Sequence, residues 1–437
     1  MSAAPAIATR PAYARYVLAV LLGVYMIHHL DRMTIALLLE PIGREFHLSD
    51  AQRGLLAGIA YAIPFALAGM PLGLLIDRVN RVRLLILLLA IWSGLTALCA
   101  LATSFWWLLL ARIGVGAAES GGTPANMAIL SDYFPPERRA RAFGVYYMGP
   151  HIGTVIGFAL AGSVAAAYGW RAAFLLVGLP GLLLVLVLAK TIREPARGAS
   201  SNAAEQASAV LLSSQSAPPF GDFLRVLARN RAALHVLAAS TLSNMVAAGL
   251  FTWLPAFMIR LHGMNVRQVG FAISLGMAPF AAMASVLGGT LVDRLGGYRA
   301  PRVAILLASS LLVATGAAIV GLTTPWVALL IGAFALQTAT HVLTVGPSYS
   351  AVLGLMPVPT RGLSGALMQV SANVLGFGVG ATLLGKLSDV LRPEFGVESL
   401  RYTMLGFNLI ELWAVAHYLA AAGALRRWTP TSVQRTT

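Results

Sequence analysis

The chain has 437 residues, of which 58% are hydrophobic and 11% are charged, and its 31 Lys and Arg outnumber its 16 Asp and Glu. Globular proteins in water carry about a quarter of charged residues, so this composition excludes a soluble globular protein and predicts a chain embedded in a lipid bilayer. The single cysteine, Cys99, excludes an internal disulfide and a cysteine metal cluster.

Twelve membrane-spanning helices are predicted in chain order. A helix needs about 20 apolar residues to cross the hydrocarbon core, and the first such segment starts near Tyr13. The runs without Asp, Glu, Lys or Arg that follow it are 54–76, 84–111, 142–170, 232–259, 268–292, 303–360 and 362–385. The run 303–360 has room for two crossings, and further helices start near Trp106 and cover 172–189 and 402–425. No segment alternates as the strands of a membrane β-barrel do, so the predicted fold class is an all-α membrane protein.

The distribution of Lys and Arg predicts the orientation of these helices. When the connections alternate between two sides, the side that holds both termini collects 21 of the 31 basic residues. By the positive-inside rule this side is the cytoplasm, and the net charge of +15 reflects topology and attraction to anionic lipid rather than binding to nucleic acid. Residues 1–16 lack an apolar core, so no cleavable signal is expected. The excess of Arg over Lys, 29 to 2, points to the inner membrane of a bacterium.

Two short sequences recur in the second half of the chain, which indicates an internal repeat. GLLIDRVNRVR at 73–83 is echoed by GTLVDRLGGYR at 289–299, an interval of 216 residues. FPPERRARAFG at 134–144 is echoed by MPVPTRGLSGA at 356–366. We therefore expect two pseudo-symmetric six-helix bundles with a binding site between them near the middle of the membrane.

The repeat predicts a six-helix bundle at 1–190, a cytoplasmic linker at 191–231 and a second six-helix bundle at 232–437. Within the linker, FGDFLRVLARNR places apolar residues on one helix face and arginines around the other, so a short helix on the inner leaflet is expected. Its apolar face consists of Phe220, Phe223, Leu224 and Leu227.

Charged residues occur inside two predicted helices of the first bundle. On helix 4, Arg112, Glu119 and Asn126 are spaced at i, i+7 and i+14, so they share one face. The corresponding positions on helix 1 are Tyr25, His28 or His29, Asp31 and Arg32. A charge at membrane depth costs about 3 kcal/mol on the lower scales, so these residues are expected to face one another or a wet cavity.

Two interpretations of these charges are open. In one, the ion pairs only hold helices 1 and 4 together. In the other, Arg32 and Arg112 bind an anionic group of a substrate, while Asp31 and Glu119 take up and release a proton. His28 is a candidate proton relay and equally fits a histidine satisfied by a neighbouring helix. The expected substrate-binding residues of this bundle are Arg32, Arg112, Glu119, Tyr25 and Asn126.

The loop after predicted helix 2 has the pattern G-x-x-x-D-R-x-x-R-x-R, which resembles the signature of the major facilitator superfamily, with Asn80 where many members have Gly. The positions that match are Gly73, Asp77, Arg78, Arg81 and Arg83, and in the second copy Gly289, Asp293 and Arg294. The resemblance covers the whole chain and implies the major facilitator fold, in which helices 1, 4, 7 and 10 line a central cavity. It also implies that the acidic loop residues latch a gate in one state only. The expected gating residues are Asp77, Arg78, Arg81, Arg141, Asp293 and Arg294.

Four stretches resemble, within this superfamily, the spinster branch of lipid transporters: LDR at 30–32, IDRVNRVRLL at 76–85, RIGVGAAES at 112–120 and PANMAILSDYF at 124–134. The organic-anion:proton symporters share the Asp-Arg pair of helix 1 and much of the loop pattern, and Ala118 stands where Gly usually precedes the helix-4 glutamate. Two kinds of substrate are therefore open: a lysolipid or sphingolipid-like anion, or a small organic anion such as a sugar acid or a monocarboxylate.

The second bundle is less polar than the first, which bears on the substrate. The stretches GLFTWLPAFM at 249–258 in helix 7 and LLIGAFALQTATHVL at 329–343 in helix 10 contain no Asp, Glu, Lys or Arg. A small, fully polar substrate would need polar partners on both walls, because a stranded polar group costs about 1 to 3 kcal/mol. We therefore expect an amphipathic anion, although scattered Asn, Gln and His are an alternative source of polar partners. The expected apolar contacts are Leu250, Phe251, Trp253 and Phe334.

The sequence predicts a secondary transporter, active or facilitative, that works by alternating access and is linked to protons. No H-E-x-x-H, G-x-S-x-G or nucleotide-binding loop occurs, so neither an enzyme nor an ATP-driven pump is expected. No cofactor or metal is expected. The expected partners are the substrate, protons and membrane lipids, and the protein is expected to be a monomer. A receptor that binds without transport is a further alternative. Glu411 in helix 12 lies outside the helices expected to line the cavity.

Overall fold

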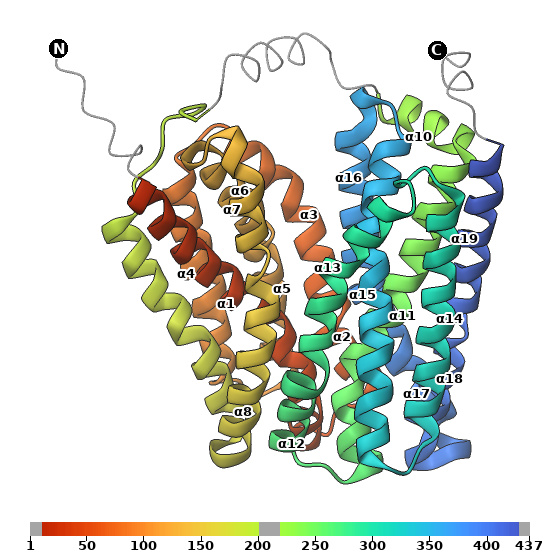
Figure 1. Cartoon of the computed structure of the whole chain (residues 1–437). Coiled ribbons are helices and arrows are strands. Elements are labelled where there is room, and N and C mark those ends of the chain that lie inside the picture. Colours follow the sequence, from red (N-terminus) through yellow and green to blue (C-terminus); the bar gives the residue numbers. More distant parts are fainter. Residues whose placement is uncertain (1–10, 201–218, 428–437) are drawn as a thin grey trace. The chain divides into compact units, whose positions relative to one another are not determined.

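The computed structural model describes residues 11–200 and 219–427, and within these ranges every regular element is helical (Figure 1). The helices form two units: unit 1 contains 11–48, 59–200 and 264–274, and unit 2 contains 49–58, 219–263 and 275–427. The helices of unit 1 are α1 (Pro11–Glu45), α3 (Ile59–Ile76), α4 (Arg81–Cys99), α5 (Phe105–Glu119), α6 (Gly122–Tyr133), α7 (Pro136–Tyr146), α8 (Gly149–Thr191) and α12 (Val266–Phe271). The helices of unit 2 are α2 (Asp50–Ala57), α10 (Phe220–Arg229), α11 (Arg231–His262), α13 (Ala278–Arg294), α14 (Pro301–Thr323), α15 (Val327–Leu355), α16 (Arg361–Val370), α17 (Ala381–Phe395), α18 (Ser399–Asn408) and α19 (Ile410–Arg426).

Twelve crossings follow from these helices. In the described residues, ten helical segments are long and apolar enough to cross a membrane. The last of them, Val358–Arg426, has 69 residues, which is enough for two crossings at about 20 residues each. Predicted helix 4 is not among the ten segments and is the remaining crossing: it is present as α5 and α6, two shorter helices that follow one another in the chain. The prediction of an all-α protein with twelve membrane helices is confirmed.

The internal repeat is visible in two helix starts. Ser49 and Gln52 form a capping box at α2, and Asn265 and Gln268 form the same box at α12. In both, the side chain of the first residue accepts a hydrogen bond from the backbone N–H of the glutamine, and the glutamine side chain accepts one from the backbone N–H of the first residue. Two N–H groups that lack a partner within the helix are thereby satisfied. The boxes lie 216 residues apart, the interval of the recurring loop sequences. Each short helix belongs to the unit opposite to that of the helix after it: α2 to unit 2 and α12 to unit 1.

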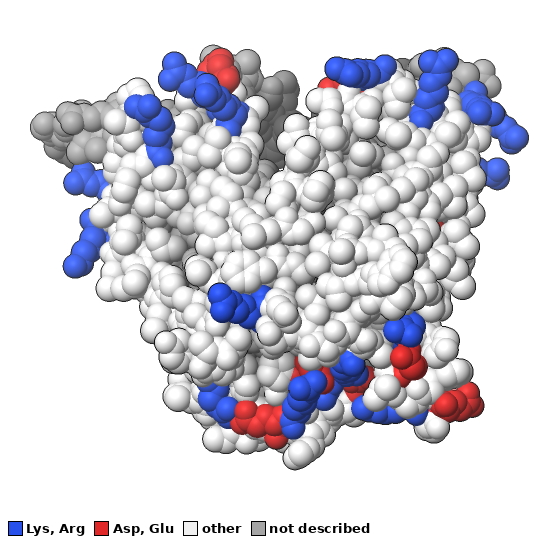
Figure 2. Space-filling model, turned by 60° about the horizontal axis from the view of Figure 1, so that its bottom comes forward, with Lys and Arg blue, Asp and Glu red and all other residues white. Residues whose placement is uncertain are grey.

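Large apolar side chains cover much of the outer surface of the helices. Leu67 and Met70 on α3 are 72% and 77% exposed, and Val286 on α13 is 71% exposed. In the view of Figure 2, the Lys and Arg side chains lie mainly near the ends of the helices, with a broad uncharged surface between them. Exposed apolar surface of this extent is unfavourable in water, so a lipid environment is the one that stabilises it.

Glycines let α8 approach α1 closely. A Cβ atom on Gly149 would lie 3.3 Å from the carbonyl oxygen of Leu22, and one on Gly153 would lie 3.0 Å from that of Met26. Side chains at these positions would push the two helices apart, so the small residues fix a tight contact. Farther along α8, Gly169 has a φ of 83°, a backbone conformation that glycine adopts without strain and that divides α8 into two crossings.

The polar face predicted on helix 4 spans the break between α5 and α6. The break is explained by Pro124, which has no N–H group and leaves the carbonyl of Ser120 without its helical hydrogen bond. Arg112, Glu119 and Asn126 are nevertheless all buried, with exposed fractions of 1%, 0% and 1%. The break just after Glu119 therefore leaves the polar residues on both sides of it buried.

The short helix predicted in the linker is α10. Phe223 and Leu227 are buried in the core of unit 2, whereas Phe220 and Leu224 are exposed. Part of the predicted apolar face thus packs on protein rather than on lipid, and contact of the exposed part with the membrane surface stays a prediction. The linker residues 201–218 lie outside the described residues.

Candidate functional site

Unit 1 gathers the charged residues that lie inside its helices. Asp31 lies on α1, and Arg112 and Glu119 lie on α5, and at most 1% of the surface of each is exposed. Arg32, the neighbour of Asp31 on α1, is half-buried. The fold therefore brings the charges of predicted helices 1 and 4 together, while the roles assigned to them stay predictions.

Asp31 and Arg112 form a buried ion pair between α1 and α5. Arg112 Nη1 lies 3.6 Å from Asp31 Oδ1, and the hydroxyl of Thr96 on α4 donates a hydrogen bond to Asp31 Oδ2. The carboxyl groups of Asp31 and Glu119 are close enough to interact electrostatically. Because like charges repel strongly at low dielectric, protonation of one carboxyl group affects the other, and the two titrate as one coupled site.

Glu119 is held by a tyrosine. Tyr61 on α3 is 1% exposed, and its hydroxyl donates a hydrogen bond to Glu119 Oε2 at 2.6 Å. His28 Nε2 lies 3.7 Å from the same oxygen. The guanidinium carbons of Arg32 and Arg112 lie 5.0 Å and 5.1 Å from the centroid of the Tyr61 ring. Tyr61 therefore contacts both arginines through its ring and one acid through its hydroxyl.

Several buried polar atoms of this cluster have no hydrogen-bond partner among the described residues. They are the three guanidinium nitrogens of Arg112, Oδ1 of Asp31 and Oε1 of Glu119. A buried polar group without a partner costs about 1 to 3 kcal/mol, so three on one arginine are unfavourable unless the arginine also binds something else. An anionic group of a substrate, and a proton on one of the acids, are ligands that satisfy these atoms.

The other predicted residues of unit 1, Tyr25 and Asn126, are connected by Tyr146 on α7. Asn126 Nδ2 donates a hydrogen bond to the Tyr146 hydroxyl at 3.0 Å, and the Tyr146 ring stacks on that of Tyr25 with 4.5 Å between centroids. The centroid of the Tyr25 ring lies 5.9 Å from that of His28. A continuous set of side chains thus links Asn126 to His28 and, through it, to Glu119.

Three residues of this site, Tyr61, Thr96 and Tyr146, were not predicted from the sequence. Each is a hydroxyl-bearing residue in a stretch without Asp, Glu, Lys or Arg, and such residues are ordinary in membrane helices. Tyr61 could have been recognised from its position deep inside the uncharged run 54–76. A tyrosine hydroxyl buried there requires a hydrogen-bond partner.

The residues predicted to contact an apolar part of the substrate lie mainly in the interior of unit 2. Trp253 is fully buried, and its Nε1 donates to a backbone carbonyl of α17 at 2.8 Å. Phe334 is buried against Gly321. Leu250 is also buried, whereas Phe251 is half-buried.

A charged network in unit 2 was not predicted. Asp50, fully buried at the start of α2, accepts hydrogen bonds from Arg260 on α11 at 2.6 Å and 2.8 Å, and from Ser388 on α17 at 2.8 Å. Asp389 accepts from the backbone N–H groups of Asp50 and Ala51, at 3.0 Å and 2.7 Å, and so caps α2. The network fixes α2, a segment of the first predicted bundle, to helices of the second half of the chain.

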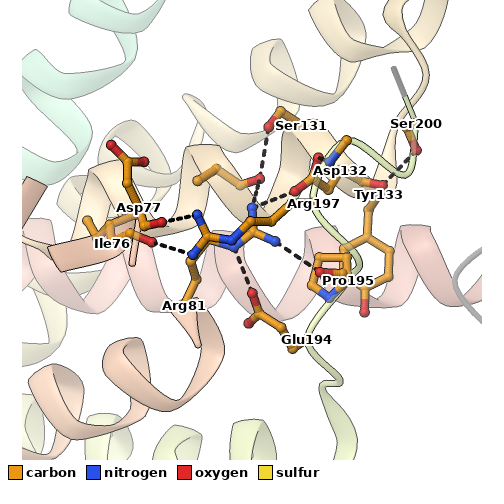
Figure 3. Close-up of polar contacts among 12 residues, drawn as sticks. Ile76, Asp77, Arg81, Ser131, Asp132, Tyr133, Glu194, Pro195, Arg197 and Ser200 are labelled. Atoms are coloured by element: carbon orange, nitrogen blue, oxygen red, sulfur yellow. Dashed lines mark hydrogen bonds and ion pairs between the residues drawn. The ribbon is translucent and has the colours of Figure 1, made fainter. Parts of the chain in front are cut away.

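Arg81, a residue of the loop signature, lies at the centre of a network at the start of α4 (Figure 3). Its Nη1 lies 2.5 Å from Asp132 Oδ2, and its Nε lies 2.7 Å from Glu194 Oε1. Its Nη2 donates to the carbonyl of Pro195 at 3.0 Å. Glu194 also accepts from the N–H of Val82 at 2.8 Å, which places a carboxylate at the N-terminus of α4. Arg81 therefore joins α4 and α6 to the segment that follows α8.

The other predicted gating residues are exposed in this structure. The backbone carbonyl of Asp77 accepts a hydrogen bond from Arg197, while the Asp77 carboxylate makes no ion pair with any described residue. Figure 3 shows that this carboxylate points away from the guanidinium groups around it. The remaining exposed residues are Arg78, Arg141, Asp293 and Arg294. A latch formed by Asp77 is not engaged here and stays a prediction.

Replacing Arg81 by Ala is expected to destabilise unit 1, because the partly buried carboxylates of Asp132 and Glu194 would lose their counter-charge. Breaking a buried pair in this way costs about 3 to 5 kcal/mol. Cys99 is buried, so a thiol-reactive dye reports the temperature of unfolding in detergent. Arg83→Ala, which removes an exposed arginine from the same helix, is the control. Equal unfolding temperatures for the two variants would contradict the stabilising role.

Comparison with known proteins relates this architecture to a family. Residues 21–393 match the sequence model of the Major Facilitator Superfamily. A solved structure of a bacterial homologue of the human lysosomal transporter spinster, in an inward-facing and unoccupied conformation, aligns with a TM-score of 0.83 and 28% identity. The alignment covers 96% of this chain and 100% of that chain. The likeness to the spinster branch that the sequence motifs suggested is confirmed.

Two relatives extend the comparison. An MFS-type efflux pump of Mycolicibacterium smegmatis is 27% identical over 417 residues, which cover 94% of each chain. The probable galactarate/D-glucarate transporter GudP of Bacillus subtilis is 25% identical over 295 residues, which cover 64% of each chain. Because the family match extends over 21–393 and the twelve helices have the expected order, this chain belongs to the major facilitator superfamily of membrane transporters.

Proposed function

We propose that this transporter carries an amphipathic organic anion, such as a lysolipid or a sphingolipid-like molecule, together with a proton. The observation that carries the proposal is the buried pair of Asp31 and Arg112, in which three arginine nitrogens have no hydrogen-bond partner among the described residues. A guanidinium with free donors binds a carboxylate or phosphate through two parallel hydrogen bonds. The half-buried Arg32, which lies against the same Tyr61 ring, supplies a second positive charge.

Binding of the proton and binding of the anion reinforce each other at this cluster. While Asp31 is ionised, it competes with the substrate for Arg112. When Asp31 takes up a proton, its attraction for the guanidinium falls, and Arg112 becomes available to the anionic group. Loss of the proton restores the pair and expels the anion. By linkage, the substrate raises the affinity for the proton by the same factor.

The charges of the cluster favour one proton for each negative charge on the substrate. Two arginines and two ionised acids balance one another. A substrate with one negative charge would leave the buried site negative, and an unbalanced charge at low dielectric is costly. Protonation of either Asp31 or Glu119 removes that charge, so the neutral combination is favoured.

The amphipathic substrate is supported by the uncharged middle of α11 and α15 and by the half-buried Phe251. The resemblance to the spinster branch supports the same choice. A small organic anion such as a sugar acid is the second candidate. It is favoured by the likeness to a probable galactarate/D-glucarate transporter and by the buried Gln337 and His341 on α15.

Competition for binding in liposomes distinguishes the two candidates. The reconstituted protein is equilibrated with a fluorescent lysolipid that bears an acidic head group, and unlabelled lysolipid or galactarate is then added. We expect displacement by the lysolipid and none by galactarate at equal concentration. Phe251→Ala should weaken binding of long-chain lysolipids more than short-chain ones, whereas Phe280→Ala, at an exposed aromatic on α13, should not. Equal displacement by galactarate would establish the second candidate, and binding without flux would identify a receptor.

We further propose the arrangement of the protein in the cell. The bundles comprise 1–190 and 232–437, with 191–231 as the linker, and the protein is a monomer in the inner membrane of a bacterium. The excess of basic residues on one side supports cytoplasmic termini. The paired loops around Asp77 and Asp293 would act as the gate, which the repeat of the loop signature supports.

A further inference from the structure

Unit 2 contains a buried carboxyl group that the mechanism above does not use. Glu411 on α19 is fully buried, and its Oε1 accepts a hydrogen bond from the hydroxyl of Ser243 on α11 at 3.4 Å. His341 Nδ1, from α15, lies 3.0 Å from the same hydroxyl and 3.9 Å from Glu411 Oε1. Three helices thus place a carboxyl group, a hydroxyl group and an imidazole in contact.

No fixed positive charge balances this carboxyl group. Among the described residues, His341 is the one basic side chain within 4.0 Å of Glu411, and Glu411 Oε2 has no hydrogen-bond partner there. An unpaired carboxylate in a low-dielectric interior costs several kcal/mol, which one hydrogen bond does not offset. A proton on either the carboxyl group or the imidazole would remove this unbalanced charge.

The hydroxyl of Ser243 connects the two groups that could hold such a proton, the Glu411 carboxyl group and the His341 imidazole. With the proton on Glu411, the carboxyl group donates to Ser243 Oγ, and the serine hydroxyl donates to His341 Nδ1. Transfer of the carboxyl proton to Oγ, together with transfer of the serine proton to Nδ1, yields a carboxylate and an imidazolium. The total charge and the positions of the heavy atoms are unchanged, so the serine acts as a relay between two acceptors.

The other titratable groups on the helices packed around this cluster are few. Tyr418, two turns farther along α19, interacts electrostatically with Glu411 and shares a hydrogen bond of 2.6 Å with Ser348. His235 on α11 and His417 on α19 form a separate pair, with 2.9 Å between their Nδ1 atoms. Most charged residues of these helices lie near helix ends: Arg231 and Arg260 of α11, Arg302 of α14, Arg361 of α16, Arg392 and Glu394 of α17, Arg401 of α18, Arg426 of α19, and Asp293 and Arg294 of α13. Lys386 and Asp389 lie in the middle of α17, where Asp389 caps α2.

We propose that Ser243, His341 and Glu411 form a second proton-binding site, contained in unit 2, which takes up and releases one proton during the transport cycle. Loss of the proton leaves a buried carboxylate without a counter-charge, so it favours a packing of α11, α15 and α19 in which Glu411 reaches water. Unit 2 thereby acquires its own response to the pH gradient, separate from the acids of unit 1. The site does not depend on the identity of the substrate proposed above.

Proton counting on the substrate-free protein in liposomes tests the site. The double variant His341→Gln with Glu411→Gln keeps polar partners for Ser243 and removes both titrating groups. After a jump from acidic to alkaline pH, a pH-indicator dye should report one proton fewer released per protein than in the native protein, and the infrared band of a protonated carboxyl group should be reduced. Equal proton release and equal carboxyl bands would overturn the proposal.

The single variant Ser243→Ala provides a second test of the site, which does not depend on the double variant. It leaves the carboxyl group and the imidazole in place, so the proton count should be unchanged. The midpoint pH of release should shift, because both groups lose the hydroxyl that hydrogen-bonds them. An unchanged midpoint would contradict a proton-binding site built on these hydrogen bonds, and this result decides alone if the double variant fails to fold. Because all of these measurements use protein without substrate, they stand even if the proposed substrate or its coupling is wrong.

Discussion

Replacing Glu119 by Gln is expected to abolish substrate accumulation driven by a pH gradient and to leave substrate exchange intact. Glutamine has nearly the shape of glutamate, and its carbonyl oxygen retains an acceptor for the Tyr61 hydroxyl, which lies 2.6 Å from Glu119 in the native protein. The amide cannot bind or release a proton, so coupling is lost while Arg32 and Arg112 still hold the anion. In proteoliposomes with a pH gradient, the internal concentration should rise only to the external one, whereas counterflow should persist.

Asp31→Asn should have the same phenotype, because the two carboxyl groups interact and titrate together. Glu45→Gln is the matched control: this acid lies at the exposed end of α1 and pairs with Arg171 at 2.7 Å. It should accumulate substrate as the native protein does. Gradient-driven accumulation with native pH dependence in both Glu119→Gln and Asp31→Asn would remove the proton role from this cluster.

Replacing Arg112 by Gln is expected to eliminate substrate binding and transport and to lower stability. The substrate loses its buried guanidinium, and the carboxylate of Asp31 loses its counter-ion, which lies 3.6 Å away. The hydroxyl of Thr96 would remain hydrogen-bonded to that carboxylate. Removing one member of a buried pair costs about 3 to 5 kcal/mol, so the unfolding temperature should fall together with binding, both measured on the purified protein.

The double variant Arg112→Gln with Asp31→Asn separates a functional from a structural role of the pair. With both charges removed, no bare carboxylate remains, so stability should return toward the native value while substrate binding stays absent. If transport returns with stability, the pair serves only to hold α1 and α5 together. Arg171→Gln, which removes an exposed arginine paired with Glu45, should change neither property appreciably, since exposed ion pairs contribute little.

The candidate site was predictable in its charged members but not in their partners. Arg112 and Glu119 are recognisable because a charge inside a membrane helix is costly and marks a buried or wet position. Tyr61 and Thr96 carry no such mark, and the contact of Tyr61 with both arginines depends on where packing places α3 relative to α1, which carries Arg32, and α5, which carries Arg112. Glu411 is marked by its charge, yet its position on α19 does not reveal that Ser243 lies within reach.

Burial also separated residues that look alike in the sequence. Trp253 and Phe251 are neighbours in one uncharged stretch, but helical geometry directs them to different faces, so Trp253 enters the core of unit 2 and Phe251 remains half-buried. Arg81 and Arg78 belong to the same loop motif, yet one is enclosed by two carboxylates and the other is exposed. A motif specifies residue types and spacing, whereas the partner that each side chain meets comes from distant parts of the chain.

By itself, the sequence determined the lipid environment, the twelve helices, the two-fold repeat and the family, because these follow from local quantities: the length of uncharged runs, the spacing of polar residues and a recurring loop motif. Only the tertiary structure decided which groups meet, including the pairing of Asp31 with Arg112 and the contact of Glu411 with His341. These depend on helix packing, which brings together residues far apart in the chain. The free energy of a buried charge is set by the neighbours it acquires there, so it cannot be read from the sequence around it.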